Sequence, residues 1–94
     1  MPVDVFALAF DDRNLAKLES HGLTIRDALD VLDENPRLMK NRSPGGAPYV
    51  LIGPTALGRM VTLPIDPTAE PGVWRPRTGY PSSDEEIQRH KAAL

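Results

Sequence analysis

The sequence predicts an α+β fold, a single small domain in which an antiparallel sheet is packed by a helical hairpin and a short C-terminal helix. Three observations lead to this prediction. The first third of the chain holds two short capped segments with helical periodicity, the middle alternates apolar runs with turn clusters, and the end carries a third helix signal. With 94 residues the chain can enclose one modest core, so residues 1–94 are treated as one domain.

The chain opens with a predicted strand and a first helix. The apolar run VDVFALAF, residues 3–10, has the pattern of a strand. Asp11 is a good N-cap for a helix over residues 12–21, because its carboxylate can accept hydrogen bonds from N–H groups of the first turn. Gly22 follows, and glycine readily adopts the left-handed conformation that ends many helices.

A second helix is predicted over TIRDALDVLDEN, residues 24–35. Thr24 and Asp27 can form a capping box at its start, and Pro36 stops it. Four apolar residues recur at helical spacing and form its inner stripe: Ile25, Ala28, Leu29 and Leu32. The two helices therefore form a short hairpin whose outer faces are acidic.

The middle of the chain predicts four strands joined by short turns. They cover residues 37–43, 48–53, 58–65 and 72–80. Connections this short favour an antiparallel meander. Pro64 and Pro76 lack an N–H group, so each belongs at an edge, a bulge or a strand end. Ser83 and Glu86 then form a capping box for a helix over residues 84–94, which gives the order β-α-α-β-β-β-β-α.

The charged residues are divided unevenly along a chain whose net charge is −2. Residues 1–36 hold eight acids against three bases, which gives −5, whereas residues 37–80 hold six bases against two acids, which gives +4. A local basic surface can attract phosphate groups whatever the total charge. The alternative is that the two parts neutralise each other in the fold.

The composition excludes several classes of site. The chain has no cysteine, so it has neither disulfides nor thiolate metal sites, and a reducing cytoplasm is its simplest location. His21 and His90 have no partner at metal-ligand spacing, so we expect no metal and no other cofactor. The longest apolar run, residues 5–10, is far shorter than the roughly 20 residues of a membrane span.

Two stretches of the sequence resemble the BrnT-type toxins of bacterial type II toxin–antitoxin pairs. In FDDRNLAKLESHGLTIRDALDVLDENP the matching positions are Phe10, Asp11, Asn14, Lys17, His21 and Gly22. In YVLIGPTALGRMVTL they are Ile52, Gly53, Thr55, Gly58 and Arg59. The resemblance extends over about residues 6–90, and the ordered set of positions carries it rather than any single motif.

Towards the C-terminus the chain keeps some family positions and changes others. Arg75 and Glu86 stand where the family has an arginine and a glutamate. Tyr80 replaces a second arginine, His90 replaces a tyrosine, and Arg77 is an addition. The resemblance implies a fold akin to the RelE-like ribonucleases and a toxin that cleaves RNA. It also implies a neutralising antitoxin with a ribbon-helix-helix DNA-binding region, so that DNA is contacted only through the antitoxin.

Cleavage of RNA by its own 2′-hydroxyl needs cations near the phosphate and a group that moves a proton. Arg59 and Arg75 are the candidate catalytic cations, because guanidinium presents paired donors to phosphate oxygens. Tyr80 or His90 could move the proton. The further candidate RNA contacts, including an aromatic ring for stacking on a base, are Arg77, Trp74 and Arg42.

Side chains alternate along an extended strand, which gives the stretch GVWRPRTGY two faces. Its residues divide into Arg75 and Arg77 on one face and Trp74, Thr78 and Tyr80 on the other. We expect Trp74 to be buried and Arg75 to share a surface with Arg59. The alternatives are that Trp74 serves only the core and that the arginines only pair with acids. The protein is then either a toxin endoribonuclease or a catalytically silent relative that binds an antitoxin through the same surface.

Overall fold

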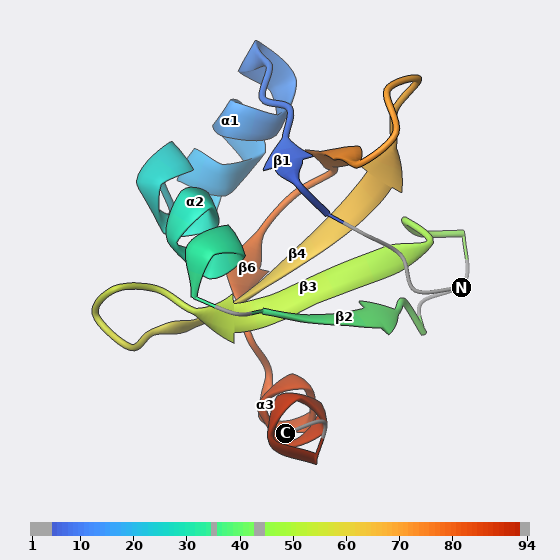
Figure 1. Ribbon diagram of the computed structural model, residues 1–94. Helices are drawn as coiled ribbons and strands as arrows, with labels where there is room; N and C mark the ends of the chain where they lie inside the picture. The colour runs from blue at the N-terminus through green and yellow to red at the C-terminus, as the bar shows by residue number, and fades with distance from the viewer. Residues whose placement is uncertain (1–4, 35, 43–44, 93–94) are drawn as a thin grey trace.

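The computed structural model describes residues 5–34, 36–42 and 45–92. The elements in chain order are β1 (Ala7–Leu8), α1 (Asp12–Ser20), α2 (Ile25–Asp33), β2 (Arg37–Lys40), β3 (Tyr49–Pro54), β4 (Met60–Pro67), β5 (Val73–Pro76), β6 (Tyr80–Pro81) and α3 (Asp84–Ala92). The predicted α+β class is confirmed, with three helices around a mostly antiparallel sheet (Figure 1). The predicted element ends at residues 3–4, 35, 43 and 93–94 lie outside the described residues.

The sheet has the strand order β1-β5-β4-β3-β2, and β6 pairs with β4 beyond the end of β5. The pairs are antiparallel except for β1 with β5, which run parallel. The first strand is shorter than predicted. Within the described part of the predicted stretch only Ala7 and Leu8 are in a strand, because β1 lies at the sheet edge and pairs only with Val73 and Trp74.

Local capping chemistry starts each helix where the sequence predicts. Asp11 accepts from the N–H of Asn14 at 2.8 Å, and Thr24 shares a capping box with Asp27. Gly22, at φ +74°, follows α1 in the left-handed conformation that a side chain would disfavour. The third predicted capping box is also present before α3. No helix in the described ranges is both long enough and apolar enough to cross a membrane.

The helices lie on both faces of the sheet (Figure 1). The hairpin of α1 and α2 covers one face, here called the inner face, and α3 lies against the other, the outer face. Alternate residues of β4 point into the inner-face core: Val61, Leu63 and Ile65, all with no exposed surface. The hairpin contributes Leu18, Leu23, Ala28 and Val31 to the same cluster.

The last predicted strand is divided into β5 and β6 by a bulge. Pro76 pairs with Ile65 and Tyr80 pairs with Thr62, so the three residues 77–79 oppose the two residues 63–64. One extra residue on one strand is the signature of a β-bulge. Gly79 lies in this bulge, where a Cβ would come within 2.7 Å of the buried Leu63 side chain, so the close approach favours glycine.

The bulge changes the face on which Tyr80 lies. Residues directly opposite in an antiparallel pair point to the same side, and Thr62 alternates with the inward Val61 and Leu63. Tyr80 therefore points to the outer face, whereas Trp74 packs on the inner-face core. The prediction that Trp74 and Tyr80 share a face is wrong, because regular alternation holds only within one uninterrupted strand.

The burial of β4 predicts unequal effects for two leucine substitutions. Leu63→Ala should lower the free energy of unfolding by about 2–5 kcal/mol, since it removes a fully buried side chain and leaves a cavity. Leu57→Ala, at a position 98% exposed, is the matched control and should change it by less than about 0.5 kcal/mol. Urea denaturation followed by circular dichroism measures both. Similar losses in the two variants would contradict the described core.

Candidate nucleic-acid interface

Strand β5 sends consecutive side chains to opposite faces of the sheet. Trp74 packs against the inner-face core, and its ring meets that of Tyr49 edge to face at 5.6 Å between centroids. Trp74 thus packs against the core as expected, but its side chain is only partly buried rather than buried. Arg75 pairs in register with Asp66 and so lies on the outer face.

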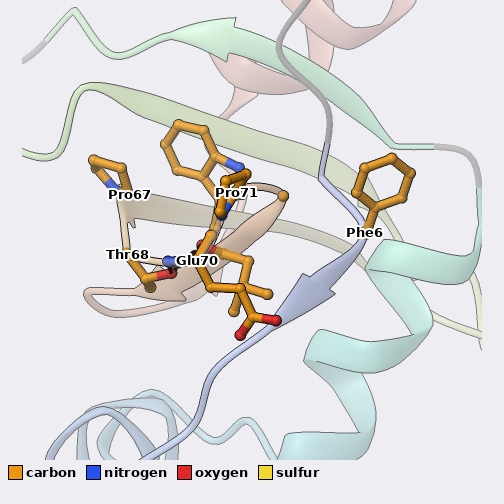
Figure 2. A pocket seen from close by; sticks show the side chains of 8 residues that line it. Phe6, Pro67, Thr68, Glu70 and Pro71 are labelled. Atoms are coloured by element: carbon orange, nitrogen blue, oxygen red, sulfur yellow. Dashed lines mark hydrogen bonds between the residues drawn. The ribbon is translucent and has the colours of Figure 1, made fainter.

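Trp74 also lines a pocket of about 330 Å³ around the β4–β5 turn. Figure 2 shows Phe6 on one side of this pocket and Pro67, Thr68, Glu70 and Pro71 together on the other. The lining is largely apolar, and its charged residue is an acid. This pocket therefore offers no attraction for phosphate.

A second pocket, of about 390 Å³, is lined almost wholly by charged side chains, which are Arg13, Lys17, Asp66, Arg75 and Arg77. We call it the cationic pocket. Two of its cations come from α1, and the other two come from β5 and the residue that follows β5. It therefore joins the start of the helical hairpin to the edge of the sheet.

Two ion pairs fix the arginines of the cationic pocket. Arg77 holds Asp66 through Nε at 3.0 Å and Nη2 at 2.8 Å, a two-point contact that sets the plane of the guanidinium. Arg75 donates from Nε to Asp11 at 2.6 Å. The hydrogen bond from Arg75, followed by the backbone N–H of Asn14, lowers the pKa of Asp11, so this carboxylate is ionised at neutral pH.

The two cations from α1 remain available to a ligand. Arg13 and Lys17 lie one helical turn apart and are exposed. Neither forms an ion pair with any residue in the part of the chain that the structure describes. Sequence reasoning did not propose them as site residues, although their spacing of four on one helix after the capping Asp11 was a usable signal.

Arg59 does not join this pocket. It is exposed in the turn between β3 and β4, where its N–H donates to Thr55 Oγ1 at 3.2 Å. Asp66, the register partner of Arg75, lies seven residues further along β4, which is about 23 Å at roughly 3.3 Å per residue. Figure 1 shows the β3–β4 turn and the β4–β5 turn at opposite ends of β4. The prediction that Arg59 and Arg75 share a surface is therefore wrong.

Tyr80 lies in a third pocket, of about 270 Å³, beside the start of α3. Its hydroxyl donates to Glu86 Oε2 at 2.8 Å, and its ring meets His21 edge-on at 6.3 Å. Burial and then the hydrogen bond to Glu86 raise the pKa of Tyr80 to about 12. At neutral pH this hydroxyl is protonated and already engaged, so it is poorly suited to accept a proton.

The two remaining candidates belong to α3 and its neighbourhood. Burial, and then the nearby charge of Arg37, lower the pKa of His90, so its imidazole is mainly neutral at pH 7. Arg42 lines the same pocket as Tyr80 and pairs with Glu85 at 3.2 Å, with both side chains largely exposed. Neither His90 nor Arg42 lines the cationic pocket. The predicted site residues are thus not brought together in one site: Arg75 and Arg77 share the cationic pocket, and Tyr80 and Arg42 share the third pocket. Trp74, Arg59 and His90 line neither of these two pockets.

Within the described ranges, no group of three or more histidine, aspartate or glutamate side chains could hold a metal ion.

The lowered pKa of His90 predicts a pH dependence of stability. In the unfolded chain His90 titrates near 6.5, above its folded pKa, so in the interval between the two the unfolded state binds more protons. The stability contributed by neutral His90 is present above that interval and is lost as the pH falls through it. His90→Gln should therefore reduce the loss of stability between pH 7.5 and pH 5.5, measured by urea denaturation. An equal loss in the variant would show that His90 makes no such contribution.

No protein-family model matches this chain, and no curated protein sequence matches it either.

Proposed function

We propose that this protein is the toxin of a type II toxin–antitoxin pair, a metal-independent endoribonuclease that binds RNA phosphate in the cationic pocket. One observation carries the proposal. Four cationic side chains converge on a single pocket, although the chain as a whole has a net charge of −2. The resemblance of the sequence to BrnT-type toxins favours the same class of protein.

The pocket suits the charge that develops when RNA is cleaved. Attack of a ribose 2′-hydroxyl on the adjacent phosphate forms a bond from the 2′-oxygen to phosphorus and breaks the bond to the 5′-oxygen of the next nucleotide, while solvent water takes the hydroxyl proton and supplies one to the leaving oxygen. The transition state carries additional negative charge on the phosphate oxygens, and donors already fixed in place stabilise that charge best. Arg75 and Arg77 are fixed in this way, because carboxylates of the same chain hold their Nε atoms. Tyr80 and His90 do not line the pocket. The rate enhancement of RNA cleavage would therefore come from electrostatic stabilisation of the phosphate by the pocket cations.

The proposal includes a partner. A small antitoxin with a ribbon-helix-helix region, encoded beside this protein, would neutralise it and would contact DNA itself. Both proteins would act in the cytoplasm, where the RNA substrate is found. An antitoxin segment rich in acidic residues would suit the cationic pocket, because it could compete there with RNA phosphate.

A second function is favoured by the state of Tyr80. Its hydroxyl is engaged by Glu86, and its pKa is raised to about 12, while Arg59 and His90 lie apart from the cationic pocket. A protein with this arrangement could bind its partner without cutting RNA. The alternative is thus a catalytically silent module whose cationic pocket holds an acidic segment of the antitoxin.

The ribonuclease proposal predicts the effect of removing one pocket cation. Arg75→Ala should slow cleavage of RNA by roughly two to three powers of ten, as loss of a preorganised electrostatic donor does elsewhere. The fold should remain intact, since Arg75 and its partner Asp11 are both partly exposed. Cleavage by purified protein, measured at low and at high salt, tests this, because competing counterions weaken phosphate contacts.

Arg26→Ala is the matched control for that experiment. Arg26 is an exposed arginine of α2, paired with Asp30 at 3.4 Å and absent from the cationic pocket. Its loss removes the same formal charge and should leave cleavage close to that of the unaltered protein. Equal losses in the Arg26 and Arg75 variants would mean that only the total charge matters, and would contradict the proposed site.

The two functions differ in what expression of the protein does to a cell. The toxin predicts growth arrest that the neighbouring antitoxin relieves, together with RNA cleavage in vitro. The silent module predicts tight binding of that neighbour with neither arrest nor cleavage. Binding measured by calorimetry beside a growth assay separates them, and cleavage by the unaltered protein would exclude the second function.

A further inference from the structure

The positive charge of the cationic pocket is concentrated at one point. A protein that follows an RNA backbone needs cations spaced along a groove. No other arginine of the described chain lines the pocket; Arg59, for example, lies at the far end of β4, and Arg42 lines the pocket around Tyr80. Arg89 donates to the carbonyl of Lys40 at 3.0 Å. The arrangement suits one strongly charged group better than a continuous chain of phosphates.

The formal charges in and around the pocket match a dianion. Four cations face the two carboxylates that hold the arginines, Asp11 and Asp66, which leaves a net charge of +2. A phosphodiester inside an RNA chain carries one negative charge. A phosphate monoester carries about −1.5 to −2 at pH 7. In the ground state a monoester would therefore nearly neutralise the pocket, whereas a diester would leave about one cation in excess until charge develops during cleavage.

The arginines also keep donors for such a group. Arg75 uses only Nε in its pair with Asp11, and within the described residues no hydrogen bond engages either of its Nη atoms. Arg77 uses Nε and Nη2 on Asp66, and its Nη1 makes only a long contact of 3.4 Å with the carbonyl of Gly45. Because the carboxylates already hold both guanidinium groups, binding a phosphate would order few further side-chain torsions.

We infer that the cationic pocket binds the terminal phosphate monoester of an RNA, with the Nη atoms of Arg75 on the phosphate oxygens and Arg13 and Lys17 closing the pocket from α1. This inference rests on the proposed function, because it takes RNA as the ligand and adds which part of the RNA is recognised. A volume of about 390 Å³ lies within the range of small-molecule sites, so part of the terminal nucleotide can enter with its phosphate. The protein would then select RNAs by their ends.

The test compares short RNAs of one sequence that differ only at their ends. One carries a 5′-phosphate, one carries a 3′-phosphate, and one has hydroxyls at both ends. Fluorescence anisotropy at low salt should show at least one phosphorylated RNA binding roughly tenfold or more tightly than the hydroxyl form. The preferred end identifies the source of the monoester. Equal affinity for all three RNAs would overturn the inference and would leave RNA binding, and with it the proposed function, in place.

Two variants test whether the preference for a phosphorylated RNA end depends on the cationic pocket. Lys17→Ala removes an exposed cation of α1 and should remove most of the preference for the phosphorylated end. Arg26→Ala removes an exposed cation of α2 outside the pocket and should retain the preference. Loss of the preference in both variants, or in neither, would overturn the assignment.

A second experiment, with a mononucleotide in place of RNA, separates this inference from the proposed function. Adenosine 5′-monophosphate and adenosine are titrated into the unaltered protein and into Lys17→Ala by calorimetry. If the protein neither binds nor cuts RNA, the proposed function fails. Tighter binding of the monophosphate than of adenosine, lost in Lys17→Ala, would still support the pocket as a monoester site. If neither this monophosphate nor adenosine 3′-monophosphate, titrated in the same way, binds more tightly than adenosine, the inference is overturned.

Discussion

Burial of β4 is the constraint on which the rest of the structure depends. This strand pairs with β3 along one edge and with β5 and then β6 along the other, while the helical hairpin covers its inner face. Its inward residues Val61, Leu63 and Ile65 have no exposed surface. Because side chains alternate, burial of these three forces Asp66 to the outer face, where it meets Arg77. The position of the cationic pocket is thus a consequence of how the core is packed.

Most of the local structure could be predicted from the sequence, because it is set by short-range chemistry. Capping residues and apolar periodicity predicted the start of all three helices, and turn clusters predicted the strands that follow. The bulge between β5 and β6 could not be predicted in this way. Its position depends on where Gly79 meets Leu63 across the sheet, a contact between residues 16 apart in the chain. One extra residue there was enough to move Tyr80 to the opposite face from Trp74.

The candidate site was predicted only in part, for a similar reason. Arg75 and Arg77 were identified from their spacing along one strand, which is local information. Their contact with α1 depends on Asp11, which caps the helix with Oδ1 and accepts from Arg75 with Oδ2 across a separation of 64 residues. That contact brings Arg13 and Lys17 into the pocket, whereas Arg59 remains at the other end of β4. One carboxylate therefore supports both the start of a helix and the geometry of the proposed site.

The central claim is that RNA is bound at the junction of α1 and β5. Chemical-shift mapping tests it most directly, with isotope-labelled protein titrated with a short single-stranded RNA and both backbone amides and arginine side chains observed. The account predicts that the largest shifts fall on Arg13, Lys17, Arg75 and Arg77 and decline towards α3 and the β3–β4 turn. Shifts centred instead on Arg59, or on the pocket around Tyr80 and Glu86, would contradict it.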